Sequence, residues 1–216
     1  FINVGIAEQT MLGMAAGMAT CGKIPFVATF AFLIAMRGCE QVRSDIAYPD
    51  LNVKLFASAS GFVIATGGTT HHATEDIGIM RSIANMTVVV PADPYASRAM
   101  IWAVAERPGP VYLRLRRGVD PEVYAEGYDL EVGRAEVLRE GSDVTLIGCG
   151  RTVYECLQAA GVLAEEGVRA RVVDMHTVKP IDGAAIEEAV RGTRLIVTAE
   201  DHNILAGLGG AVAEVM

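Results

Sequence analysis

Three ionisable side chains stand at positions where they could do chemistry: Glu8, His71 and Arg117. Glu8 lies where a short apolar stretch meets an alanine-rich segment. A carboxyl group buried at such a place resists ionisation, so it could share or donate a proton. Taken alone, however, a glutamate in the first turn of a helix is ordinarily a surface residue that compensates the helix dipole.

The histidines follow a glycine pair, Gly67 and Gly68, that could cradle a ligand at a helix N-terminus or simply form a turn. Because His71 and His72 are adjacent, their side chains diverge by roughly 100° on a helix and are unsuited to chelating one metal ion together. Glu75 lies one helical turn beyond His71, but no further histidine or cysteine completes a zinc set. The sequence therefore predicts no metal site in this chain.

Composition excludes several classes of protein. The densest basic run, Arg114, Arg116 and Arg117, is large enough for one phosphate but too short for a nucleic-acid surface, and the net charge is -8. The longest apolar run, 24–36, is closed by Lys23 and Arg37 and is much shorter than the roughly 20 residues of a membrane helix. Four scattered cysteines favour the reducing cytoplasm over a disulfide scaffold.

Short apolar strands alternate with helices along the whole chain, which is typical of parallel sheets covered by helices on both faces. In the first part the pattern predicts strands over 24–29, 53–57, 86–90 and 111–115, and helices over 8–20, 33–47, 74–83 and from 93 onward. In the second part it predicts strands over 144–147, 170–173 and 195–198, and helices over 153–166, 184–191 and from 207 onward.

Residues 116–133 are polar and contain glycine, proline and acidic side chains, so we expect a linker there. The sequence thus predicts an α/β protein with two open, mostly parallel, doubly wound sheets. We divide it into a domain over 1–120, a linker over 121–133 and a domain over 134–216. Since the chain begins and ends within apparent elements, we expect each domain to lack a terminal segment.

Segments spread over nearly the whole chain, in order, resemble the transketolase family. Residues 1–9, Phe-Ile-Asn-Val-Gly-Ile-Ala-Glu-Gln, are similar to the signature around the family's cofactor glutamate. Further similar segments are 15–19, 26–30, 41–47, 70–81, 91–93, 109–112 and 200–209.

This resemblance implies a thiamine-diphosphate pyrimidine-binding domain followed by the family's C-terminal domain. Glu8 would be catalytic, because it would hydrogen-bond the aminopyrimidine ring of thiamine diphosphate and so activate this carbanion-stabilising cofactor. Ile6, Phe30, Leu33 and Met36 would complete the cofactor site. Phe30 keeps an aromatic position of the family, whereas Leu33 and Met36 replace aromatic residues.

For the substrate, the resemblance implies that His71 acts beside the cofactor and that Arg117 grips a sugar phosphate with its forked guanidinium. Two positions depart from the family. An aspartate falls on Gly67 and a histidine on Ala59. We therefore expect that cofactor binding is retained while the sugar site is altered.

The Gly-Asp-Gly run through which these enzymes bind the diphosphate does not occur in the chain. We therefore expect an N-terminal, diphosphate-binding partner subunit that holds Mg²⁺ or Ca²⁺, in a heterotetramer with two of each subunit. The enzyme would transfer a two-carbon ketol unit from a ketose to an aldose, with sugar phosphates or related molecules as substrates. The alternatives are a deoxyxylulose phosphate synthase, a 2-oxo acid dehydrogenase β subunit or a non-catalytic partner subunit.

Overall fold

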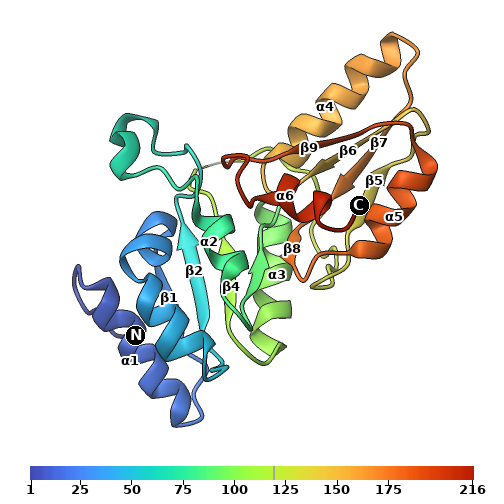
Figure 1. Cartoon of the computed structure of the whole chain (residues 1–216). Coiled ribbons are helices and arrows are strands. Elements are labelled where there is room, and N and C mark those ends of the chain that lie inside the picture. The colour runs from blue at the N-terminus through green and yellow to red at the C-terminus, as the bar shows by residue number, and fades with distance from the viewer. Residues whose placement is uncertain (119) are drawn as a thin grey trace.

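The computed structural model describes residues 1–118 and 120–216 and contains two sheets. Figure 1 shows the first sheet among the blue and green elements, apart from its orange edge strand at 177–179, and the second sheet among the yellow to red ones. The strand order is β1-β2-β4-β3-β8 in the first sheet and β5-β7-β6-β9 in the second. Most neighbouring strands are parallel, and both sheets carry helices, so the predicted α/β class is confirmed.

The first sheet has parallel strands β1 (Phe26–Phe30), β2 (Lys54–Ser58), β3 (Thr87–Val89) and β4 (Val111–Arg114), with β8 (Thr177–Lys179) antiparallel to β3. Its helices are α1 (Glu8–Thr20), α2 (Asp76–Ser82) and α3 (Pro94–Glu106). The start of α3 follows from its sequence, because the Asp93 side chain accepts a hydrogen bond from the Ala96 amide at 2.7 Å and Pro94 supplies the first turn.

The second sheet has β5 (Glu136–Arg139), β6 (Val144–Gly148), β7 (Ala170–Asp174) and β9 (Ile196–Ala199). Its helices are α4 (Thr152–Glu165), α5 (Gly183–Gly192) and α6 (Leu208–Ala213). β6 pairs in parallel with β7 and β9, whereas β5 is antiparallel to β7 at one edge.

Alternate residues of the first sheet face opposite helices, as the two-residue repeat of a strand requires. Val88 and Tyr112 belong to the core formed with α1 and α2, whereas Val89 and Leu113 belong to the core formed with α3. β3 and β4 are buried on both faces, which explains their continuous apolar sequences, whereas the edge strand β1 is partly exposed.

The larger core does not stop at the boundary between the sheets. It contains Leu55 and Ile77 of the first part together with Val173, Ile186 and Leu208 of the second. With β8 added to the edge of the first sheet, the two halves share one continuous apolar interior. The structure thus joins the halves more tightly than a linker between two separate cores would require.

One predicted helix needs correction. The region expected as one helix over 33–47 consists of two π-helical segments, η1 (Leu33–Arg37) and η2 (Gln41–Ala47), separated around Gly38. A side-chain atom at Gly38 would lie 2.2 Å from Leu12 of α1, so a glycine is needed for this close packing. The glycine-rich loop also contains a 3₁₀ segment, η3 (Ala65–Thr70). As expected, the described residues between 116 and 133 form no helix or strand.

Candidate active site

Glu8 is the first residue of α1, and its side chain is 6% exposed. It forms an ion pair with Arg37, whose Nη1 lies 3.0 Å from Oε2 of the carboxylate. Arg37 is the last residue of η1 and is about half exposed. The pair therefore joins the start of α1 to the segment that follows β1, and it engages only one of the two carboxylate oxygens.

This geometry corrects the expected ionisation of Glu8. The sequence suggested a carboxyl group that resists losing its proton in an apolar pocket. Instead, a main-chain hydrogen bond at Glu8 and the neighbouring Arg37 guanidinium lower the pKa of the carboxyl below its ordinary value, although burial acts in the opposite direction. Glu8 is therefore a carboxylate in this chain, ready to accept a hydrogen bond.

An aromatic side chain links the predicted cofactor residues to His71. The Phe32 ring lies with its centroid 6.0 Å from that of Phe30, at the end of β1, and 5.3 Å from that of His71. The His71 ring is oriented by Thr70, whose hydroxyl oxygen is 2.9 Å from Nδ1. His71 and Phe30, far apart in the sequence, thus both lie close to the Phe32 ring.

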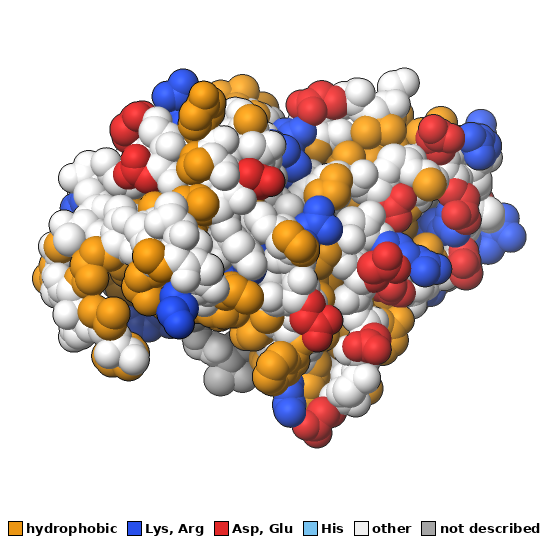
Figure 2. Space-filling view, turned by 90° about the horizontal axis from the view of Figure 1, so that it is seen from below, with side chains coloured by type: hydrophobic (Ala, Val, Ile, Leu, Met, Phe, Trp, Pro, Cys, Tyr) orange, Lys and Arg blue, Asp and Glu red, His pale blue; other side chains and the backbone are white. Residues whose placement is uncertain are grey.

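The remaining predicted cofactor residues include two large apolar side chains that face solvent. Ile6, just before α1, is 92% exposed, and Met36 on η1 is 47% exposed, whereas Leu33 is partly buried. Figure 2 shows fewer charged side chains on the side of the first sheet than over the second. Exposed apolar residues beside a carboxylate are typical of a surface that another molecule covers.

The loop before His71 leaves no room for the aspartate that the family places at position 67. A side-chain atom added to Gly67 would lie 2.7 Å from Cβ of His71 and 2.9 Å from Ile64. Ala59 is fully buried, so the larger side chain of a histidine would need room that its packed surroundings do not leave. Both departures are therefore built into the packing of this loop.

The arginine run does not form a single phosphate site. Arg114 is buried and paired with Asp76, with Nε 2.8 Å from Oδ2, while Arg116 pairs with Asp120 at 2.9 Å. Arg117 is exposed, and within the described residues it has no hydrogen bond or ion pair with the other predicted site residues. The expectation that the three arginines could hold one phosphate together is wrong, since the fold uses Arg114 internally.

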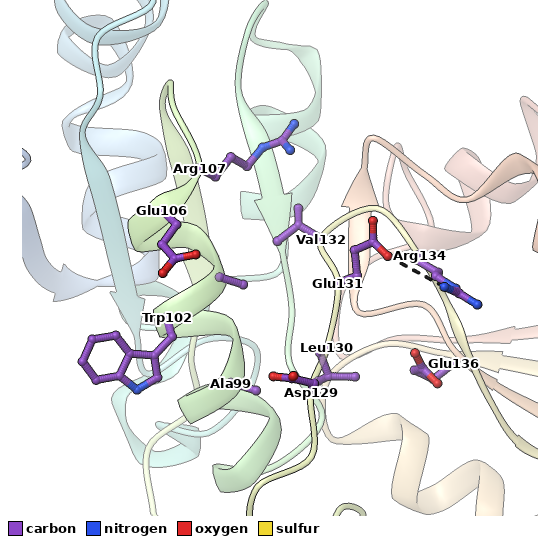
Figure 3. A pocket seen from close by; sticks show the side chains of 11 residues that line it. Ala99, Trp102, Glu106, Arg107, Asp129, Leu130, Glu131, Val132, Arg134 and Glu136 are labelled. Carbon is purple, nitrogen blue, oxygen red and sulfur yellow. Dashed lines mark ion pairs between the residues drawn. The ribbon is translucent and has the colours of Figure 1, made fainter.

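A hollow of about 740 Å³ lies elsewhere. Figure 3 shows it between α3, with Trp102 and Glu106, and the segment that carries Glu131 and Arg134. None of the predicted site residues lines it. Among the predicted site residues, Ile6, Met36 and Arg117 are instead exposed on the surface of this chain.

Among the described residues no three histidine, cysteine or acidic side chains are grouped so as to hold a metal ion. No helix in the same part of the chain is long and apolar enough to cross a membrane.

The sequence did not single out Phe32 or Arg37 as part of the site. Phe32 lies between two positions assigned to the cofactor wall, so its spacing was a usable signal. Arg37 was noted only as the charge that ends an apolar run, and only the fold brings it to Glu8.

The chain is similar in sequence to known proteins over its whole length or nearly so. It is 44% identical, over its whole length, to a putative transketolase C-terminal section of Methanocaldococcus jannaschii, covering 68% of that protein. It is 43% identical to a 6-deoxy-6-sulfo-D-fructose transketolase subunit of Clostridium sp. (strain MSTE9), with 99% of this chain and 66% of that protein covered.

Among solved structures, the chain is similar to one described as a split gene transketolase, inactive beta4 tetramer. The TM-score is 0.93 at 48% identity, over the whole chain and 70% of the other. Residues 1–121 match the family model of the transketolase pyrimidine binding domain, and residues 133–216 match that of the transketolase C-terminal domain. The chain therefore belongs to the transketolase family, whose members depend on thiamine diphosphate.

Proposed function

We propose that this chain is the pyrimidine-binding subunit of a split transketolase that moves a two-carbon ketol unit from a ketose donor to an aldose acceptor. The observation that carries the proposal is the Glu8 carboxylate, fixed at the start of α1 beside exposed apolar side chains. Arg37 engages one of its oxygens and leaves the other for a ring N–H donor. This arrangement fits the flat, polar-edged aminopyrimidine of thiamine diphosphate.

In this proposal Glu8 holds the aminopyrimidine ring in place through a hydrogen bond at the remaining carboxylate oxygen. Phe30, Leu33, Met36 and Ile6 contribute the apolar contacts around the ring. When bound, thiamine diphosphate supplies the carbanion-stabilising centre of the reaction. The protein side chains supply orientation, exclusion of water and the fixed negative charge of Glu8.

His71 and Arg117 would bind the substrate. We assign His71 to the oxygens near the reacting carbon, because Phe32 holds it close to Phe30. Arg117 is exposed and suited to a phosphate or a similar anion. The sugar site lacks the aspartate of the family, because position 67 is a glycine and cannot take an aspartate without displacing His71. The substrate would therefore differ from ordinary pentose phosphates.

The diphosphate and its Mg²⁺ or Ca²⁺ would be held by an N-terminal partner subunit in a heterotetramer with two copies of each chain. Exposed Ile6 and Met36 provide surface that such a partner can cover. The proposed domain limits are 1–120 and 134–216, with 121–133 as the linker. The four cysteines are free, which fits a reducing compartment such as the cytoplasm.

The test is reconstitution with the partner subunit, followed by assay of ketol transfer with xylulose 5-phosphate and ribose 5-phosphate and with non-standard ketoses. Glu8→Gln should lower kcat by about 100-fold or more, because it removes the fixed negative charge beside the cofactor ring, and loss of one such electrostatic contact typically costs that much. Glu165→Gln, at the exposed end of α4, is the matched control and should leave kcat unchanged. Unimpaired turnover in Glu8→Gln would remove the catalytic role.

The same assay separates a second candidate, a subunit that completes the oligomer without catalysis. The loss of polar side chains at Gly67 and Ala59 favours this candidate over a fully equipped sugar site. A complex that binds thiamine diphosphate but turns over neither xylulose 5-phosphate nor the non-standard ketoses would support the non-catalytic role.

A further inference from the structure

We infer that Asp201, in the second half of the chain, is a positioning residue that holds the loop carrying His71. This loop, residues 61–73, is called the His71 loop below. The inference rests on the proposed function only for the role of His71 toward substrate. The contact between Asp201 and the His71 loop is part of the fold and does not depend on that role.

The His71 loop is closed at its base by a short antiparallel bridge. The Gly61 amide donates to the Ala73 carbonyl at 3.1 Å, and the Ala73 amide donates back to the Gly61 carbonyl at 3.0 Å. Between them the loop contains η3 and Gly68, whose φ is 66°. The position of His71, two residues before the bridge, therefore depends on where this base is fixed.

Residue 201 contacts the start of the base directly and is linked to its end through Arg114. The Asp201 carboxylate accepts a hydrogen bond from the Phe62 amide at 3.3 Å. Its main-chain carbonyl accepts from Nη2 of Arg114 at 2.9 Å, and the same nitrogen donates to the Ala73 carbonyl at 2.9 Å. Asp201, in the segment between β9 and α6, thus restrains the start of the His71 loop directly and its end together with Arg114.

The contact between Asp201 and the loop requires a glycine at position 61. Gly61 has a φ of 62°, and a Cβ atom there would lie 1.9 Å from Oδ2 of Asp201. Any larger residue would push the carboxylate away from the loop. The approach of Asp201 is therefore matched by a residue that has no side chain.

Asp201 and Arg114, which together hold the base of the His71 loop, are called the clamp below. The Arg114 side of the clamp is fixed by buried partners. Arg114 is held by Asp76, through contacts of 2.8 and 3.2 Å to the two carboxylate oxygens, and Tyr112 donates to the same carboxylate at 2.8 Å. Asn203 extends the clamp, since its side-chain amide donates to the Thr74 carbonyl at 2.6 Å. Because these groups are fixed, Asp201 can restrain the loop instead of moving with it.

The second half of the chain would consequently contribute to substrate binding without touching substrate. Loss of the Asp201 carboxylate would loosen the His71 loop while leaving Glu8, on α1, in place. The expected effect falls on the KM for the sugar more than on kcat, and the affinity for thiamine diphosphate stays unchanged.

The test compares Asp201→Ala with Asp201→Asn in the complex with the partner subunit. In Asp201→Ala, amide hydrogen exchange of residues 61–73 should rise about tenfold, and the KM for the ketose should rise by a similar factor. Asp201→Asn retains an acceptor oxygen and should recover most of the protection. Leu205→Ala, an exposed position in the same segment, is the control and should change neither quantity.

Exchange in the His71 loop that is unchanged in Asp201→Ala would overturn the inference. Faster exchange with an unchanged KM would support the clamp and would instead overturn the substrate role of His71 in the proposed function. The two failures are thus distinguishable, and Gly61→Ala, which displaces the carboxylate from the other side, should reproduce the exchange result of Asp201→Ala.

Discussion

Asp174, the last residue of β7, offers the sharpest test of the electrostatics of this fold. Its side chain is fully buried, Oδ2 accepts a hydrogen bond from the Tyr124 hydroxyl at 2.7 Å, and Oδ1 has no partner among the described residues. Burial, reinforced by the negative charges of Asp93 and Glu136, raises the pKa of Asp174 to about 8, against the favourable Tyr124 hydrogen bond. At neutral pH the carboxyl is therefore protonated in the folded protein.

A carboxyl whose pKa is raised by folding binds its proton more tightly in the folded state. Its stabilising contribution is complete below the unfolded pKa of about 3.9 and is lost as the pH rises to about 8. The slope is about 1.4 kcal/mol per pH unit over this window. Asp174→Asn carries no titrating group at this position. Its free energy of unfolding, relative to that of the wild type, should therefore rise with pH by up to about 1.4 kcal/mol per pH unit and level off above pH 8.

The assay is urea unfolding of both proteins at intervals between pH 4.5 and 9. Asp143→Asn provides a control of opposite sign, because Arg169 holds the pKa of that partly exposed carboxyl below its ordinary value. This control should give no gain in stability at high pH. Parallel stability curves for Asp174→Asn and the wild type would refute the reasoning, since they would require an ionised Asp174 in the folded protein.

Further predictions concern three basic residues. Arg37→Met should raise the pKa of Glu8 toward its ordinary value, which the acid limb of a pH–kcat/KM profile of the reconstituted enzyme would reveal as a shift to higher pH. Arg114→Met should cost about 3–5 kcal/mol of unfolding free energy, measured in urea, because it leaves Asp76 buried without its partner. Burial and Arg107 lower the pKa of Lys54 to about 8, so the wild type should gain stability relative to Lys54→Met from pH 8 to 10.5.

The elements that sequence reasoning located well are those whose signals are local. The Asp93-Pro94 start of α3 is an example, because both the cap and the first turn are determined by adjacent residues. The parallel strands were equally visible, since burial on both faces requires continuous apolar runs. Glu8 was found for the same reason, as its neighbours along the chain formed a distinctive segment.

The elements and contacts that were missed depend on residues far away in sequence. β8 has only three residues and exists because β3 offers it an edge. The ion pair of Arg37 with Glu8 spans 29 positions, and that of Arg114 with Asp76 spans 38. Composition indicates that such charges need partners, but only the folded chain selects which partner each one takes.

The attachment of β8 to the first sheet also bears on how this polypeptide can be divided between genes. A break in the linker would look harmless from composition, yet it would separate β3 from β8 and cut a core that contains both Leu55 and Leu208. Each fragment would expose apolar surface and an unpaired strand edge, a combination that promotes aggregation. The two halves are therefore expected to be inherited as one reading frame, whatever the arrangement of the rest of the enzyme.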